Sequence, residues 1–170
     1  MKVRIAVTDA NIFIDLHDLE LTSSFFNLDL EIHTTTAVFY ELYSDQQQIL
    51  KAYQSVNKLN IHNLGEQDFI EIFEEGYPKS LSEADKSVLH VANKINACVL
   101  SSDKTLRNYA KNKEIHYHGM IWVFDQLVEK SVLTKKEAAS KLSQLVAVNF
   151  LFRNNRKLGD EIEKRLKIWR

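Results

Sequence analysis

The chain has 170 residues, of which 45% are hydrophobic and 26% charged, and its net charge is −1 at pH 7. This length and composition suit one ordinary globular domain with a full-sized core. The near-zero charge does not single out a polyanion as partner, and no apolar run reaches the ~18–20 residues that span a bilayer. The apolar stretch near residue 5 is too short for a signal peptide, so we expect a cytoplasmic protein without membrane contact.

The charge is unevenly distributed along the chain. Residues 151–170 carry seven basic and three acidic residues, whereas the preceding 150 residues have a net charge of −5. An acidic body with a basic tail fits a metal site beside a phosphate-binding edge, although solvated helix faces give the same pattern. The single cysteine, Cys98, excludes an internal disulfide, favours a reducing compartment, and lies in an apolar run typical of core packing.

Short segments with the pattern of β-strands alternate with helical segments along the chain. The predicted strands cover residues 5–7, 30–34, 59–64, 97–100 and 114–118. The predicted helices run from about residue 12 into the twenties, over 36–43, 45–58 and 67–75, from Ser82 onward, and over 104–111, 120–130, 135–152 and 159–169. This alternation predicts an α/β fold, with a central parallel five-stranded sheet flanked by helices.

We expect the strand order 3-2-1-4-5, which places the carboxyl ends of the first and fourth strands side by side. We also expect a single domain over residues 1–170. Its α/β core covers residues 1–118, and a C-terminal helical extension covers residues 119–170.

Asp9 directly follows the first strand, an apolar run typical of a central strand buried on both faces. A carboxylate at the edge of a core is costly to desolvate unless it gains a cation or several hydrogen bonds. Ligand sites of open α/β sheets lie beyond such strand ends. Capping of the following helix explains a lone Asp9 equally well. Asn11 either orients a ligand carboxylate or a metal-bound water, or serves the turn.

Three further acids lie where partners of Asp9 are expected. Glu41 is the only charge among residues 37–43 and points along an apolar helix face without a nearby partner. Asp85 is the third residue of a capping box opened by Ser82, at the end of an apolar helix stripe. Asp103 follows the fourth strand and precedes a helix, so helix capping is the default explanation for it.

Taken together, the four acids predict a cation site. Clustered carboxylates repel one another and raise one another's pKa, and a divalent cation cancels this repulsion. Ligand sets made only of oxygen favour Mg²⁺ or Mn²⁺ over Zn²⁺. The six histidines show no HxxxH or HExxH spacing, which argues against a nitrogen-based site.

Four segments resemble, in order, the acidic blocks of PIN-domain ribonucleases: TDANIFIDL, VFYEL, SEADKSVLHVA and VLSSDKTLRNYA. The resemblance extends from about Val3 to His118. It implies a PIN-like Rossmannoid fold whose catalytic, metal-binding acids are Asp9, Glu41, Asp85 and Asp103. Asn11 stands where the family has a small polar residue, and Ser101 replaces the threonine of the last block but keeps a hydroxyl, so both are expected to support the site. Ser102, at the middle position of that block, supplies no outer carboxylate.

Gly119–Trp122 and the helices after it look like the C-terminal extension of one bacterial PIN subgroup. This similarity implies the toxin of a type II toxin–antitoxin pair. It also implies an antitoxin protein as partner and a homodimer as the assembly.

The expected reaction is the metal-dependent hydrolysis of phosphodiester bonds in single-stranded or structured RNA by an endoribonuclease. A bound Mg²⁺ or Mn²⁺ lowers the pKa of a water molecule and neutralises charge in the transition state. Lys104, Arg107 and Lys111 share one helix face beside Asp103 and are expected to follow the RNA backbone, although a solvated basic face is commoner. Single-stranded RNA suits a cleft better than duplex.

Two other functions fit part of the pattern. A catalytically inactive PIN-like module that binds RNA or protein would share the fold, but it has no need to retain four repelling acids. A phosphohydrolase of another Rossmann-like class would use Asp9 as nucleophile together with a second aspartate two residues later. This chain has Asn11 at that position, which weakens the second alternative.

Overall fold

The structure, a computed structural model, describes residues 3–170, which form two compact units. The sheet unit comprises the chain up to Ile14 together with Asp29–Gly119, and the helical unit comprises Asp15–Leu28 together with Met120–Arg170. The first helix, α1 (Ala10–Asp18), contributes residues to both units. The acids predicted to form the site all belong to the sheet unit.

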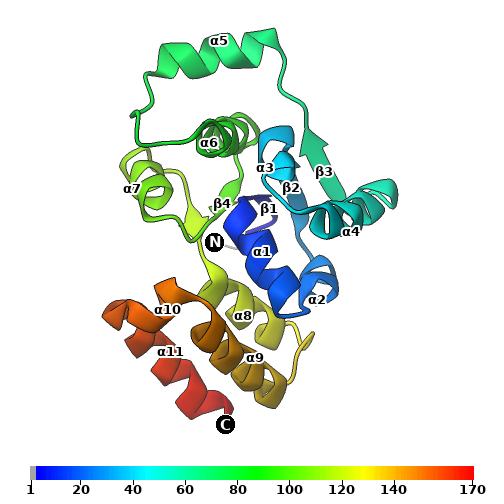
Figure 1. Cartoon of the computed structure of the whole chain (residues 1–170), viewed down its shortest axis with the longest axis vertical. Coiled ribbons are helices and arrows are strands. Elements are labelled where there is room, and N and C mark those ends of the chain that lie inside the picture. The colour runs from blue at the N-terminus through cyan, green and yellow to red at the C-terminus, as the bar shows by residue number, and fades with distance from the viewer. Residues whose placement is uncertain (1–2) are drawn as a thin grey trace. The chain divides into compact units, whose positions relative to one another are not determined.

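The described residues of the sheet unit form a five-stranded parallel sheet in the order β3-β2-β1-β4-β5, which confirms the predicted order (Figure 1). Its strands are β1 (Ile5–Thr8), β2 (Glu31–Thr35), β3 (Leu59–His62), β4 (Cys98–Leu100) and β5 (Tyr117–His118). In the central strand, Ala6 pairs with Ile32 on one side and Cys98 on the other. Because β1 is paired along both edges and its residues Ala6 and Val7 are fully buried, the chain leaves this strand from the middle of the core.

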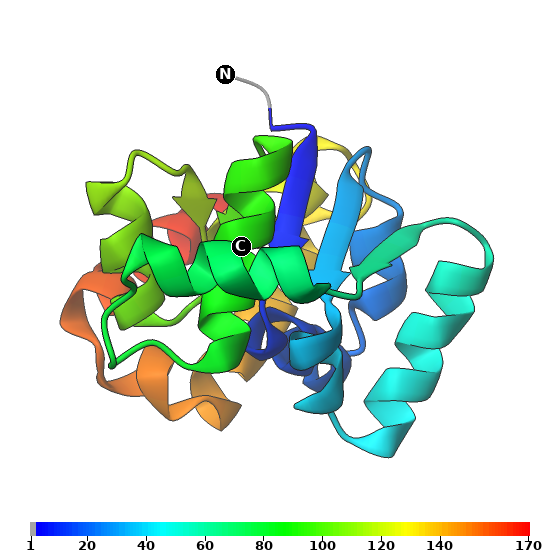
Figure 2. The ribbon, with the colours of Figure 1, turned by 90° about the horizontal axis from the view of Figure 1, so that it is seen from above.

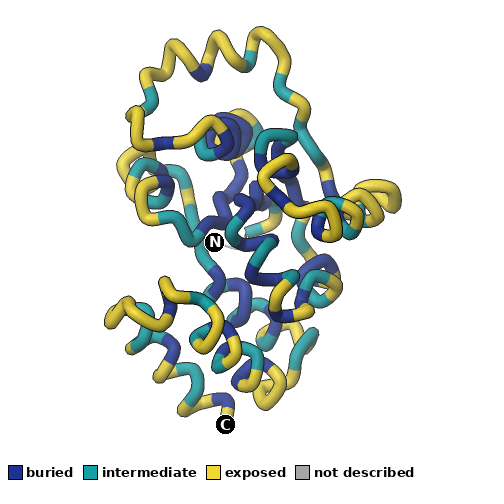
Figure 3. Tube along the Cα trace, viewed as in Figure 1, coloured by how far each residue is buried: buried dark blue, intermediate teal, exposed yellow. Residues whose placement is uncertain are grey.

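The helices of the sheet unit include α3 (Thr36–Tyr40), α4 (Ser44–Ser55), α5 (Glu66–Glu75), α6 (Glu83–Ile95) and α7 (Lys104–Asn112). α6 packs on β1, β2 and β4, and α5 packs in turn on α6 (Figure 2). α6 buries apolar side chains at helical spacing, among them Val88, Leu89 and Ala92. α5 is mostly exposed, as Figure 3 shows, and buries Ile72. The packing of α6 on the sheet therefore fixes the position of its first turn, which contains Asp85.

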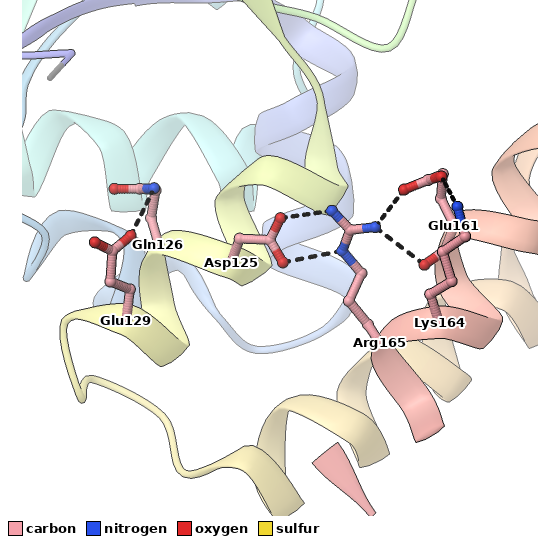
Figure 4. Close-up of polar contacts among 6 residues, drawn as sticks. All are labelled: Asp125, Gln126, Glu129, Glu161, Lys164 and Arg165. Atoms are coloured by element: carbon pink, nitrogen blue, oxygen red, sulfur yellow. Dashed lines mark hydrogen bonds and ion pairs between the residues drawn. The ribbon is translucent and has the colours of Figure 1, made fainter. Parts of the chain in front are cut away.

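The helical unit contains α2 (Thr22–Phe26), α8 (Met120–Glu129), α9 (Lys135–Val148), α10 (Phe150–Asn154) and α11 (Arg156–Trp169). Its core includes Phe124, Leu127 and Leu142, which are fully buried. Arg165 of α11 reaches Asp125 of α8 with two hydrogen bonds, from Nε at 3.0 Å and from Nη2 at 2.8 Å (Figure 4). This bidentate ion pair joins the two helices, because the planar guanidinium group donates two parallel hydrogen bonds to the two carboxylate oxygens.

Several predicted helix limits are wrong, and local backbone features explain them. The helix predicted from residue 12 into the twenties is divided into α1 and α2, because Glu20 between them has a left-handed conformation with φ of 57°. The helix predicted over 135–152 is divided at Asn149, whose side chain caps α10. The side chain of Asn155 caps α11, so that helix begins earlier than predicted.

Cys98 lies in the buried strand β4, as its apolar neighbours predict. Burial raises the pKa of its thiol to about 12, so the reactive thiolate is suppressed. Among residues 3–170, no helix combines the length and the apolar character that crossing a membrane requires.

We expect Arg165→Lys to destabilise the helical unit, because a lysine ammonium cannot reproduce the two parallel hydrogen bonds to Asp125. The free energy of unfolding should fall by about 1 kcal/mol, a modest value because both side chains are partly exposed. Urea denaturation measures this change. Lys164→Ala, which removes an exposed pair with Glu161, is the control and should cost less than about 0.5 kcal/mol. Equal losses in the two variants would contradict the special role of the paired contact.

Candidate metal centre at the carboxyl ends of β1 and β4

Asp9 lies where β1 ends and α1 begins, and it is only 4% exposed. One carboxylate oxygen, Oδ1, accepts the backbone N–H of Ala10 at 2.8 Å. The other, Oδ2, accepts the Ser101 hydroxyl at 2.9 Å and the Asn11 side-chain amide at 3.0 Å. These three donors compensate part of the cost of removing the carboxylate from water.

Ser101 and Asn11, the two predicted supporting residues, join the end of β1 to the end of β4. The Ser101 hydroxyl donates to Asp9 and accepts the backbone N–H of Asp103 at 3.0 Å. It also accepts the Asn11 amide at 3.3 Å, while the Asn11 carbonyl oxygen accepts the backbone N–H of Ser102 at 2.9 Å. A hydroxyl has one proton to donate and two lone pairs, so this arrangement uses its full capacity and fixes its orientation.

Asp85 and Asp103 both cap helices, as the alternative reading of the sequence predicts. Asp85 completes the capping box of α6, where its Oδ2 accepts the backbone N–H of Ser82 at 2.9 Å. Asp103 is the N-cap of α7, and its Oδ1 accepts the backbone N–H of Leu106 at 2.8 Å. Within residues 3–170, the second oxygen of each carboxylate accepts no hydrogen bond. Capping therefore leaves one oxygen of each residue for a ligand.

Glu41 does not lie within an apolar helix face, contrary to the prediction. α3 ends at Tyr40, and Glu41 is its C-cap, on the exposed corner before α4. Partial burial of the carboxyl group, with the negative charge of Asp85 as a second cause, raises the pKa of Glu41. The corner thus still presents Glu41 to Asp85, although by a turn rather than by a helix face.

Three of the four predicted acids interact electrostatically. Burial is the main cause that raises the pKa of Asp9, to about 6. Hydrogen bonds from Ala10 and Ser101 oppose this shift, and the charges of Asp85 and Glu41 add to it. Asp103 joins the group through its backbone contact with Ser101. In the part of the chain that the structure describes, none of the four acids pairs with a lysine or arginine.

The donor chemistry of this group fits a hard divalent cation. It offers carboxylate oxygens from four segments, and its negative charge has no partner among residues 3–170. The buried Ser102 hydroxyl oxygen also has no hydrogen-bond partner among these residues, and the backbone N–H groups of Ser102 and Asp103 donate to Asn11 and Ser101. Carboxylate and hydroxyl oxygens are ligands that Mg²⁺ and Mn²⁺ prefer. The donor types therefore suit such an ion, but among residues 3–170 no three of these acids bring ligand atoms within 4.8 Å of one another.

A second group of metal-ligand types, which the sequence analysis missed, joins α5 to α6. One ligand atom from each of Asp68, Glu71 and His90 lies within 4.8 Å of the others. His90 Nε2 lies 2.8 Å from Asp68 Oδ1, and Lys94 Nζ lies 3.1 Å from the same oxygen. The hydrogen bond with His90, followed by those from Gly65 and Lys94, lowers the pKa of Asp68. This group already contains a cation, so an ion-pair cluster between two helices accounts for it.

The predicted basic face of α7 is only partly available for a ligand. Lys104 and Lys111 are exposed, whereas the guanidinium carbon of Arg107 lies 5.0 Å from the centre of the Tyr117 ring. This cation–π contact holds the guanidinium group of Arg107 against Tyr117, so its charge is less available to a phosphate. The two lysines are therefore the better candidates for phosphate contacts.

The fold is that of an α/β protein, and the acids lie at the edge of the sheet where its strand order reverses. The chain belongs to the PIN domain family, whose model matches residues 5–167. Members of this family are generally metal-dependent nucleases. None of the curated proteins is similar enough in sequence to count as a match.

Solved structures of two archaeal proteins are similar to this chain. A PilT N-terminus domain protein from Sulfolobus solfataricus P2 has a TM-score of 0.50 and 17% identity, over 74% of this chain and 94% of its own. A domain of a functionally unknown protein from Methanocaldococcus jannaschii DSM 2661 has a TM-score of 0.48 and 22% identity, over 69% and 91% of the two chains. At such identities, the first likeness supports the fold alone.

Without divalent cations, we expect Asp9→Asn to stabilise the fold near neutral pH. Because the pKa of Asp9 is raised from 3.8 to about 6, its ionisation opposes folding as the pH rises through this window, by up to about 3 kcal/mol. Asparagine removes this penalty but is a poorer acceptor for Ser101 and Asn11. The net gain should be about 1–2 kcal/mol at pH 7.5 and should vanish at pH 4.

Urea denaturation in EDTA at the two pH values measures this gain. The exposed Glu74→Gln is the control and should leave the pH dependence of stability as it is. A difference between Asp9→Asn and the unaltered chain that stays constant from pH 4 to pH 7.5 would show that Asp9 is not the titrating group.

Proposed function

We propose that this chain is an endoribonuclease that hydrolyses phosphodiester bonds of single-stranded or structured RNA and depends on Mg²⁺ or Mn²⁺. The proposal is supported by the electrostatic interaction of Asp9, Glu41 and Asp85, and by Asp103, whose backbone N–H is bound by the same Ser101 hydroxyl that donates to Asp9. The negative charge of these acids has no counter-cation among the described residues, and the pKa of Asp9 is raised to about 6. A structural cluster of acids would be expected to include its own lysine or arginine.

The four acids have different roles in the proposed site. Asp9 and Asp103 would bind the ion directly, and Glu41 and Asp85 would complete the site or hold bound waters. When bound, the ion lowers the pKa of a water molecule and neutralises charge in the transition state. Asn11 and Ser101 hold the Asp9 carboxylate in one orientation through its Oδ2 atom.

The RNA backbone is expected to contact the exposed lysines of α7. Lys104 directly follows Asp103, and Lys111 lies on the same face of the helix. Arg107, predicted to belong to this face, supplies less charge because it lies over Tyr117. Two ammonium groups that begin beside the acids would hold phosphates next to the position of cleavage.

The biological role that we propose is that of the toxin of a type II toxin–antitoxin pair, acting in the cytoplasm as a homodimer and inhibited by an antitoxin. The similarity of Gly119–Trp122 and the following helices to a bacterial PIN subgroup supports it. In this proposal, residues 1–170 act as one domain, with the site in the 1–118 core. A small upstream reading frame that encodes a DNA-binding protein, and growth inhibition relieved by its co-expression, would test this role.

A catalytically inactive binding module is the second candidate function. Its support is that Asp85 and Asp103 both cap helices, which gives these two acids a structural role without any cation. It does not account for Asp9 or Glu41. Isothermal titration with Mn²⁺ separates the two candidates, because an inactive module requires no cation affinity.

We expect Asp9→Asn to abolish Mn²⁺-dependent cleavage of single-stranded RNA while leaving the circular dichroism spectrum unchanged. The variant removes a negative charge from the centre of the acidic group, so calorimetry should also show lost Mn²⁺ binding. Asp68→Asn is the matched control, because it alters the other acidic group and should retain both properties. Full activity in Asp9→Asn, or loss of Mn²⁺ binding in Asp68→Asn alone, would exclude the proposed site.

We expect the double variant Lys104→Glu, Lys111→Glu to bind RNA more weakly and with a smaller dependence on salt. Losing two phosphate contacts should reduce the slope of log affinity against log salt concentration by about 1–2. Fluorescence anisotropy with EDTA present, which prevents cleavage, measures both quantities. Lys135→Glu, Lys136→Glu carries the same change of charge on α9 and serves as the control. An unchanged slope in the first variant would remove α7 from the RNA-binding surface.

A further inference from the structure

Two exposed tyrosines flank Glu41 on the corner between α3 and α4. Tyr40 is the last residue of α3 and Tyr43 is the N-cap of α4, and they are 73% and 76% exposed. The residue before each of them is buried, since Phe39 is 6% and Leu42 is 5% exposed. Phe39 and Leu42 thus anchor the corner in the core, and the two tyrosine rings point into solvent.

The backbone of this corner is held by side chains of α4. Gln46 accepts the backbone N–H of Tyr43 at 3.0 Å. The Gln47 amide donates to the carbonyl oxygens of Phe39 at 3.1 Å and Leu42 at 3.0 Å. The main chain that carries the tyrosines is therefore fixed, and a ligand that contacts the rings has to restrict only their side-chain torsions.

The corner combines aromatic rings with charges of both signs, since Glu41 and Asp45 are acidic and Lys51 is basic. The Phe39 ring meets the Tyr40 ring edge-on, with the ring centres 5.6 Å apart. The exposed ammonium group of Lys51 lies 5.7 Å from the centre of the Phe39 ring. The exposed tyrosine rings match the flat base of a nucleotide, whereas Lys51, like Arg107, has its charge engaged by a ring of the fold.

The tyrosines lie next to a residue of the acidic group. Glu41 lies between them in the chain, and its pKa is raised in part by Asp85. The fold gains little from either ring, because most of each remains in water. We infer that Tyr40 and Tyr43 form a stacking subsite for unpaired bases of the nucleic acid strand that enters the acidic site.

This inference rests on the proposed function and narrows its substrate. Bases inside a duplex are already stacked on their neighbours, so the tyrosines select single strands, loops or bulges. Stacking on an aromatic ring depends little on base identity. The subsite therefore sets the structural class of the substrate and leaves its sequence to other contacts.

The test compares ring-removing with ring-retaining variants. In EDTA, each single variant, Tyr40→Ala or Tyr43→Ala, should bind fluorescein-labelled octauridylate about 5- to 150-fold more weakly than the unaltered chain. Tyr40→Phe and Tyr43→Phe should bind it like the unaltered chain, because they keep the ring. Phe73→Ala, which removes an 87% exposed ring from α5, is the matched control and should have no effect.

An abasic octamer and the deoxy form of the octauridylate complete the experiment. The abasic strand keeps its phosphates but has nothing to stack, so the alanine variants should not weaken its binding. The deoxy strand should lose affinity by the same factor as the RNA. Unchanged octauridylate binding in Tyr40→Ala, Tyr43→Ala, or equal losses with the abasic strand, would overturn the inference and leave the rings to a protein partner.

Cleavage distinguishes failure of the subsite from failure of the proposed function. With Mn²⁺, Tyr40→Ala, Tyr43→Ala should raise the KM for octauridylate and change kcat little. If the unaltered chain cleaves RNA and the double variant keeps its KM, the subsite is wrong and the nuclease proposal remains. If the unaltered chain cleaves no RNA but loses binding on removal of the rings, the nuclease proposal is wrong and the subsite remains.

Discussion

The burial of the Asp9 carboxylate at the end of the central strand is the constraint on which the site depends. β1 is paired on both edges, so the residue that follows it has to lie in the core. Three hydrogen bonds compensate part of the desolvation, but burial and the nearby acids still raise the pKa of Asp9 to about 6. The neighbouring strand end is organised to meet this carboxylate, with the Ser101 hydroxyl as the link.

The predicted strand order is confirmed, although alternation of strand and helix and right-handed crossovers only narrow the possible orders and do not fix one. The helix limits could not be predicted with the same accuracy. Glu20 is left-handed, and Asn149 caps α10 while its amide also donates to Asp15 at 2.9 Å. That second contact joins residues far apart in the chain, and no local pattern contains it.

The candidate site shows the same division between local and tertiary signals. Asp9 and Asp103 were recognisable because each follows an apolar strand, and Asp85 because of its spacing from Ser82. The prediction that Glu41 lies on a helix face was wrong, because α3 ends one residue before it. The cluster of Asp68 and His90 was missed, because its partners come together only when α5 packs on α6.

The double role of Asp85 and Asp103 has a consequence for how the centre assembles. Each uses one oxygen to start its helix, and Asp9 accepts the first amide of a third helix, α1. Three helix beginnings, each bearing a partial positive charge, therefore already oppose the negative charge before any ion arrives. In the proposed site, the folded backbone already holds these carboxylates in place, so binding and release of an ion would not require the chain to refold.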